Sequence, residues 1–247
     1  MTTVITSSTK PPPPSHPIDV LNNDTARLYT HIHPVLVLSL YAFQFKAIVA
    51  DPIPALTRTL IPLSILQIAY VAICLPPTGD TATAVPTTEK RKPGDKKKAE
   101  KGKLEREVGA KIIPAFLSLI IASAAAIPLL TTILILFGAP LTTHHAHTML
   151  AAAHIAFLAT LPLVYVHGVD GATWREIVAL LKPVDEVYGG MIGTVVGAWL
   201  GAIPIPLDWD RAWQKWPVTI VTGAYAGWAV GKLLGGTLLK GRKIVFE

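Results

Sequence analysis

Two aspartates placed two positions apart are the first residues of this chain that could do chemistry. Asp208 and Asp210 flank Trp209 in a D-x-D pattern, which in lumenal glycosyltransferases holds a metal ion and a phosphate-linked sugar. Arg211 follows at once, so the alternative is a salt-bridged turn that Trp209 and Trp213 anchor at a membrane surface. Because two carboxylates alone are a weak metal signal, we predict no metal, no cofactor and no catalytic residue here, but a docking surface for a partner.

Four histidines form a second cluster. His144, His145 and His147 are close together, and His154 follows His147 by two helical turns on the same face. Histidine can bind zinc or shuttle protons. No Asp or Glu lies in 139–160 to orient such ligands, so polar residues at a membrane interface are the simpler interpretation. The role of the cluster stays open.

Two cations lie inside apolar stretches, where an ionisable side chain is costly and suggests function. Lys46 is close enough to the end of its stretch to extend its amine to the interface. Arg58 could pair with Asp51 or bind a lipid phosphate. Lys46, Asp51 and Arg58 are therefore candidates for contact with a partner or a lipid.

The elements that must position these residues are membrane-spanning helices. Of the 247 residues 51% are hydrophobic and only 15% are charged, too few charges to cover a soluble domain, and the apolar residues run in long blocks. The single cysteine, Cys74, excludes an intrachain disulfide. We therefore predict an all-α polytopic membrane protein. Its six predicted spans are 33–50, 53–75, 112–138, 147–169, 187–206 and 217–236.

Basic residues predict the orientation of these spans. The segment 76–111 carries ten Lys and Arg and should be a cytoplasmic loop, which with six spans places both termini in the cytoplasm. Because the charges lie between apolar blocks, we do not expect nucleic-acid binding. Residues 1–30 read as a flexible tail without a cleavable signal, residues 31–247 as one membrane domain, and about 174–182 as a short surface helix.

Glycine recurs at every fourth position in the last two predicted spans. Such a spacing keeps the glycines on one slowly drifting face and lets another helix backbone approach closely. The alternative is that glycine is simply frequent in membrane helices, and the spacing leaves open whether the ladders pack on each other or on a partner. The ladder residues are Gly189, Gly193, Gly197, Gly201, Gly223, Gly227, Gly231 and Gly235.

Several patches resemble one family, the phosphatidylinositol-glycan class F (Pig-F) proteins. The most specific is Trp199-Leu-Gly-Ala-Ile-Pro-Ile-Pro-Leu-Asp-Trp-Asp-Arg211, continued by Trp213-Gln-Lys-Trp-Pro217 and the glycine ladder. Tyr41-Ala-Phe-Gln-Phe-Lys46 and Leu181-Lys-Pro-Val184 also match, and the likeness covers most of 33–236. Ala212 departs from it, since the family often has proline there.

The resemblance implies a protein of the endoplasmic reticulum membrane that acts in GPI-anchor biosynthesis. Pig-F-like chains stabilise the ethanolamine-phosphate transferases that modify mannoses of the GPI precursor, and those partners carry the metal-dependent catalytic domain. This chain is then no enzyme on its own, and contact with phosphatidylethanolamine or the GPI precursor is a further expectation. The alternative is a stand-alone membrane lipid enzyme or lipid transporter.

Overall fold

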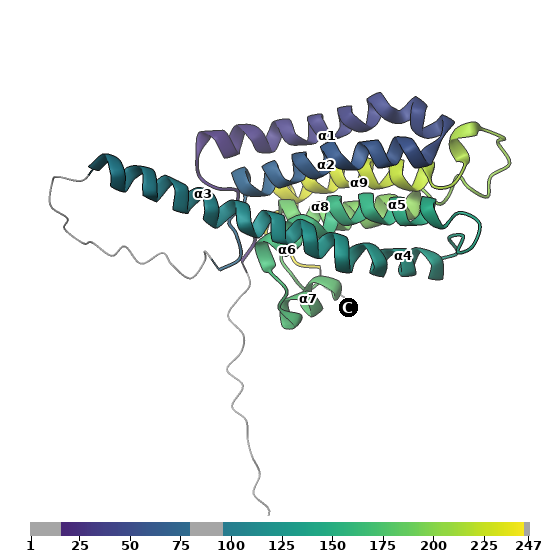
Figure 1. The fold of residues 1–247 in the computed structure, drawn as a ribbon. Helices are drawn as coiled ribbons and strands as arrows, with labels where there is room; N and C mark the ends of the chain where they lie inside the picture. The colour runs from purple at the N-terminus through teal and green to yellow at the C-terminus, as the bar shows by residue number, and fades with distance from the viewer. Residues whose placement is uncertain (1–15, 80–95, 245–247) are drawn as a thin grey trace, which may run out of the picture.

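The structure, a computed structural model, describes residues 16–79 and 96–244. All regular secondary structure in these residues is helical, and the long helices lie roughly along one direction as a bundle (Figure 1). The helices are α1 (Asp24–Ala50), α2 (Pro52–Cys74), α3 (Lys96–Ile121), α4 (Ile127–Leu136), α5 (His145–Ile155), α6 (Leu161–His167), α7 (Gly171–Val178), α8 (Glu186–Leu200) and α9 (Val218–Gly236).

Two π-helical turns each join two α-helices into one longer helix. The turn Ala122–Ala126 joins α3 to α4, and Ala156–Thr160 joins α5 to α6. Each is followed two residues later by a proline, Pro128 or Pro162. Proline has no N–H and its ring clashes with the carbonyl four residues earlier, so a wider turn ahead of it keeps the helix continuous.

Four helices in the described part of the chain are long and apolar enough to cross a membrane. They are 24–50, 52–74, 109–136 and 145–167. Helix α8 has only 15 residues, fewer than the roughly 20 that a span needs. Helix α9 has 19 residues, but its glycines and Lys232 make it less apolar. The predicted count of six spans therefore stays a prediction.

The first helix begins earlier than predicted. It starts at Asp24 and not at residue 33, because Asn23 caps it by accepting a 2.7 Å hydrogen bond from the Ala26 N–H. Residues 24–30, expected to belong to a flexible tail, are thus helical. Leu21, just before this helix, is also fixed to the bundle, because its N–H donates a hydrogen bond to the Cys74 carbonyl at 2.8 Å.

Two other predicted boundaries also differ. The segment 76–111, predicted as a loop, is helical from Lys96 onward, since Lys, Ala and Glu favour a helix. The predicted span 187–206 keeps its helix only to Leu200. Turns follow it, because Pro204 and Pro206 cannot donate backbone hydrogen bonds.

The predicted surface helix at 174–182 is displaced toward the N-terminus. Helix α7 spans Gly171–Val178, and its N-cap is Asp170, whose side chain accepts from the Thr173 N–H at 2.8 Å. That backbone hydrogen bond also holds the pKa of Asp170 below its usual value. A cap placed three residues earlier than predicted accounts for the displacement.

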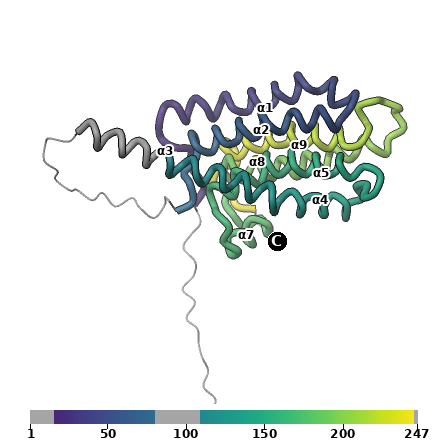
Figure 2. Tube along the Cα trace, viewed as in Figure 1, coloured from purple at the N-terminus to yellow at the C-terminus, as the bar shows by residue number. Residues whose placement is uncertain are grey.

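Hydrogen bonds tie the loops together at each end of the bundle. At one end, Lys215 donates to the Ala50 carbonyl at 2.9 Å, and the indole of Trp216 donates to Thr148 at 3.2 Å. At the other end, the Val184 N–H donates to the Arg242 carbonyl at 2.8 Å. Figure 2 shows the 201–217 loop at one end and the short helix α7 toward the other.

Candidate functional site

A charge pair lies inside the bundle where α8, α9, α1 and α2 meet. Lys232 of α9 is ion-paired with Glu186, the first residue of α8, and their side chains are only 4% and 13% exposed. The same carboxylate oxygen accepts hydrogen bonds from Thr30 of α1 and, at 3.0 Å, from Tyr70 of α2. One carboxylate thus joins four helices.

Aromatic rings surround the lysine. Its ammonium lies 3.6 Å from the ring centroid of Tyr70, close enough for a cation–π contact. The ring of His33 stacks on that of Tyr70, with centroids 4.4 Å apart, and lies edge-on to Trp228. The lysine is therefore neutralised by a carboxylate and sheltered by rings.

From the sequence alone, neither Lys232 nor Glu186 is predicted as a site residue. The signal for Lys232 is present, because an ionisable residue inside a predicted span is a functional candidate by default. The carboxylate that pairs with it lies 46 residues earlier in the chain. Only the packing of α8 on α9 makes them neighbours.

The two glycine ladders face each other along the contact between α8 and α9. A Cβ added to Gly193 or Gly197 would lie closer than 3.0 Å to backbone atoms of α9, and one added to Gly223 or Gly227 would lie equally close to α8. Backbone at such proximity leaves no room for any side chain. The ladders therefore pack on one another.

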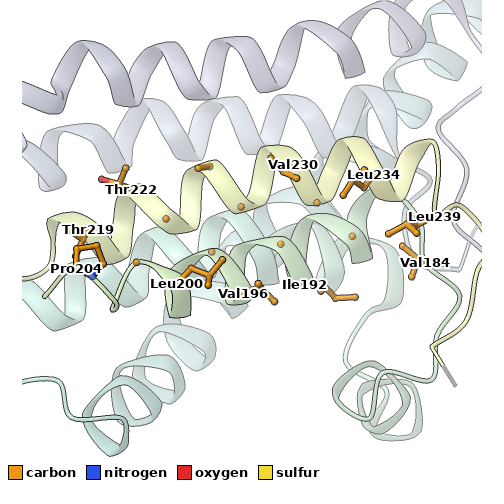
Figure 3. A pocket seen from close by; sticks show the side chains of 18 of the residues that line it. Val184, Ile192, Val196, Leu200, Pro204, Thr219, Thr222, Val230, Leu234 and Leu239 are labelled. Carbon is orange, nitrogen blue, oxygen red and sulfur yellow. The ribbon is translucent and has the colours of Figure 1, made fainter. Parts of the chain in front are cut away.

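A groove of about 860 Å³ runs along this seam (Figure 3). The glycines form part of its lining, and apolar side chains stand on both sides. Only α8, α9, their flanking segments and Phe45 of α1 contribute to it, so it opens to the surroundings of the bundle. Its side walls include Ile192, Val196 and Leu200 of α8 and Val230 and Leu234 of α9.

The loop 204–216, which carries the predicted docking surface (the docking loop), is organised by Gln214, a residue that no sequence pattern singles out. Its amide nitrogen donates to the carbonyls of Pro204 at 2.8 Å and Leu207 at 2.7 Å. Its amide oxygen accepts from the Arg211 N–H at 2.8 Å. Gln214 is buried, so one side chain satisfies three backbone groups and holds the loop in shape.

The predicted loop residues lie around this scaffold. Asp208, Trp209, Asp210 and Arg211 are all exposed, and the Trp209 ring lies 5.8 Å from that of the half-buried Trp213. No ion pair among the described residues involves Arg211, so the salt-bridged turn considered as an alternative is not formed. Nor do the described residues contain any group of three or more His, Cys, Asp or Glu that could hold a metal.

The other predicted cations lie on the outside of the bundle. Lys46, Asp51 and Arg58 are all exposed. Within the described residues, no ion pair joins Arg58 to Asp51. Contact of Arg58 with a lipid phosphate or a partner stays a prediction.

Comparison with known proteins assigns the chain. The profile of the GPI biosynthesis protein family Pig-F matches residues 32–236. This chain belongs to the Pig-F family. A similar protein is glycosylphosphatidylinositol anchor biosynthesis protein 11 of Aspergillus fumigatus. The two are 46% identical over an alignment of 258 positions, gaps included, which covers 92% of this chain and 86% of that protein.

A second Pig-F relative supports the assignment over the same extent. The protein of the same name from Neurospora crassa is 43% identical over 228 residues, covering 92% of this chain and 80% of its own length. No solved structure matches the chain. The matched range 32–236 contains the ion pair, the glycine seam and the docking loop.

The histidine cluster of this Pig-F chain divides into two parts. His144 and His147 lie near the loop end, with ring centroids 5.0 Å apart. His154 is fully buried, where its ring bonds to the Tyr225 hydroxyl at 2.8 Å and to the Leu56 carbonyl at 3.2 Å. His154 thus links α5, α9 and α2 as part of the core.

Proposed function

We propose that this Pig-F chain is a non-catalytic stabilising subunit of the GPI ethanolamine-phosphate transferases that modify mannoses of the GPI precursor. Family membership supports a role in GPI-anchor biosynthesis. The observation that carries the subunit role is the loop shaped by Gln214. It presents Asp208, Asp210 and Arg211 exposed and, within the described part of the chain, without ion pairs, as a docking surface needs.

The proposed setting is the endoplasmic reticulum membrane, with six helices crossing it and both termini in the cytoplasm. The arrangement of loops supports this topology. The turn at Asp51, the segment 137–144 and the docking loop carry few Lys or Arg and gather at one end, while the basic segment 237–244 lies at the other. Residues 31–247 then act as one membrane domain, and its docking loop faces the lumen.

Lipid contact is a secondary part of the proposal. Lys46 and Arg58 lie exposed on helices α1 and α2, at the end near Asp51. Cations at this depth reach phosphate groups of the lumenal leaflet. Phosphatidylethanolamine and the GPI precursor both carry such phosphates.

The test is the variant Asp210→Asn, with co-purification of the transferase and accumulation of GPI intermediates measured together. Loss of one charge from a docking surface should weaken the complex only partly, by about 1–3 kcal/mol of binding free energy. The control is Asp19→Asn, which changes an exposed aspartate at the opposite end, whose ion pair with Lys240 is worth little.

Two outcomes would contradict the proposal. Full recovery of the complex with a complete block of ethanolamine-phosphate transfer would assign chemistry or substrate binding to this chain. A wild-type chain that captures no larger subunit in mild detergent, yet acts on lipid alone, would favour a stand-alone lipid enzyme or transporter.

A further inference from the structure

We infer that the groove beside the glycine seam is the seat for one transmembrane helix of the transferase subunit. This inference rests on the proposed function and adds the surface at which the two subunits meet inside the membrane. Three features of the groove support it: its length, an unpaired hydroxyl in its wall, and its charged end.

The length of the groove fits a helix better than a lipid chain. Helix α8 has 15 residues, and at 1.5 Å per residue this is roughly 22 Å. The groove continues past both ends of α8, to Pro204 in one direction and to Leu239 and Arg242 in the other. It therefore approaches the whole hydrocarbon thickness of about 30 Å, whereas one acyl chain extends through a single leaflet of about half that depth.

The hydroxyl belongs to Thr219, in the first turn of α9. Its side chain lines the groove next to Pro204 (Figure 3), is 7% exposed, and finds no hydrogen-bond partner for Oγ1 among the residues that the structure describes. By contrast, Thr222 one turn later donates to the Val218 carbonyl at 2.7 Å. The oxygen itself is enclosed, and an unpaired buried hydroxyl is costly, so a neighbour that opens this corner of the groove and offers an acceptor would relieve that cost.

A neighbouring helix can supply that group, and a hydrocarbon chain cannot. Membrane helices contact each other through small residues and through Ser, Thr, Asn or Gln side chains that hydrogen-bond across the interface. The half-exposed glycines that line the groove, Gly193, Gly223 and Gly227, present no side chain to obstruct such a helix. Val196 and Val230, 48% and 56% exposed, provide apolar walls for it.

The charged end gives the expected helix a direction. Arg242 and Lys243 line the groove beyond the end of α9 and are exposed. The C-terminal end of a helix carries partial negative charge, which cations stabilise. The partner helix should therefore place its C-terminal end, or an acidic residue, beside Arg242.

The deciding experiment fills the groove with a large side chain and compares a matched neighbour. Val196→Trp occupies the groove, while Val195→Trp changes an equally exposed valine of α8 that does not line it. In the full-length chain, Val196→Trp should lower transferase recovery about tenfold or more, and Val195→Trp should not. Thermal unfolding of each isolated variant checks that the fold is retained.

A second variant keeps the test decisive if tryptophan disturbs the fold. Thr219→Val removes a hydroxyl that makes no hydrogen bond, so the isolated chain should unfold at the same or a higher temperature while transferase recovery falls. A photo-crosslinking residue at position 196 should label the transferase, and one at position 195 should not.

The outcomes separate the two proposals. If the wild-type chain recovers the transferase and Val196→Trp and Thr219→Val recover it equally well, the groove is not the seat, although the subunit role stands. If Val196→Trp instead loses only a phospholipid that co-purifies with the wild type, the groove holds lipid and the inference is wrong. If the wild type recovers no transferase, both proposals are wrong.

Discussion

The ammonium of Lys232 and the carboxylate of Glu186 form an ion pair in the interior of the bundle, where the lysine side chain is 4% exposed. Removing two charges from solvent is costly, and the cost is recovered only when further hydrogen bonds complete the site. Tyr70 and Thr30 provide them. The stability of the bundle should therefore depend on the pair being complete.

Removing one charge of the pair should destabilise the bundle more than removing both charges. Lys232→Met leaves Glu186 without its cation and should cost about 3–5 kcal/mol, seen as a lower unfolding temperature in detergent. The double variant Glu186→Gln with Lys232→Met leaves no unpaired charge and should recover most of that loss. Equal destabilisation by the single and double variants would show that the two charges are not coupled.

The glycine seam should not tolerate even one methyl group. Gly197→Ala places Cβ closer than 3.0 Å to backbone atoms of Gly223 and Gly227, so the helices must separate, at about 1–3 kcal/mol. Gly109→Ala in α3 is the matched control, because no other helix in the described residues comes within 4 Å of its Cβ position and alanine favours a helix. Unfolding temperatures that move equally in both would mean that the seam is not tightly packed.

The docking loop should lose its shape when Gln214 becomes glutamate. The change keeps the size of the side chain but replaces the amide that donates to Pro204 and Leu207 by a second acceptor. Amide hydrogen exchange of residues 204–212 should rise by an amount equivalent to about 1–3 kcal/mol. Asp208→Asn, which alters an exposed charge in the same loop, should leave exchange unchanged; the reverse pattern would contradict the role of Gln214.

The N-cap of α8 predicts a pH dependence. Asp185 accepts from the N–H groups of Ile18, Val187 and Tyr188, but its burial dominates and raises the pKa of the carboxyl above the model-peptide value of 3.8. A raised pKa means that the stability from this group is full below the unfolded value and is lost as pH rises through the folded value. The unfolding temperature of the wild type minus that of Asp185→Asn should therefore be larger at pH 4 than at pH 7, and a difference that grows with pH would contradict this.

The topology can be tested at Asn23-Asp24-Thr25, a glycosylation sequon at the start of α1. With the N-terminus in the cytoplasm it should stay unmodified. Asn23 also caps the helix, so the sharper variant is Thr25→Ala, which removes the sequon but leaves the cap. A glycosidase-sensitive shift in gel mobility that disappears in Thr25→Ala would overturn the topology.

Much of the architecture follows from local pattern. Long apolar blocks predict an all-helical membrane protein, and the four-residue spacing of glycines predicts two smooth helix faces. The loop around Asp208 and Trp209 also stands out by composition. These features depend on residues close together in the chain, and that is the range over which a sequence pattern determines structure.

Other features are decided only when the helices pack. The partner of Lys232 lies 46 positions away, and the carbonyls that Gln214 binds become neighbours only after the chain turns at Pro204. That the ladders pack on each other is likewise a property of the pair of helices. A spacing defines which face a residue occupies, but the opposing face is chosen by the balance of burial and hydrogen bonding over the whole bundle.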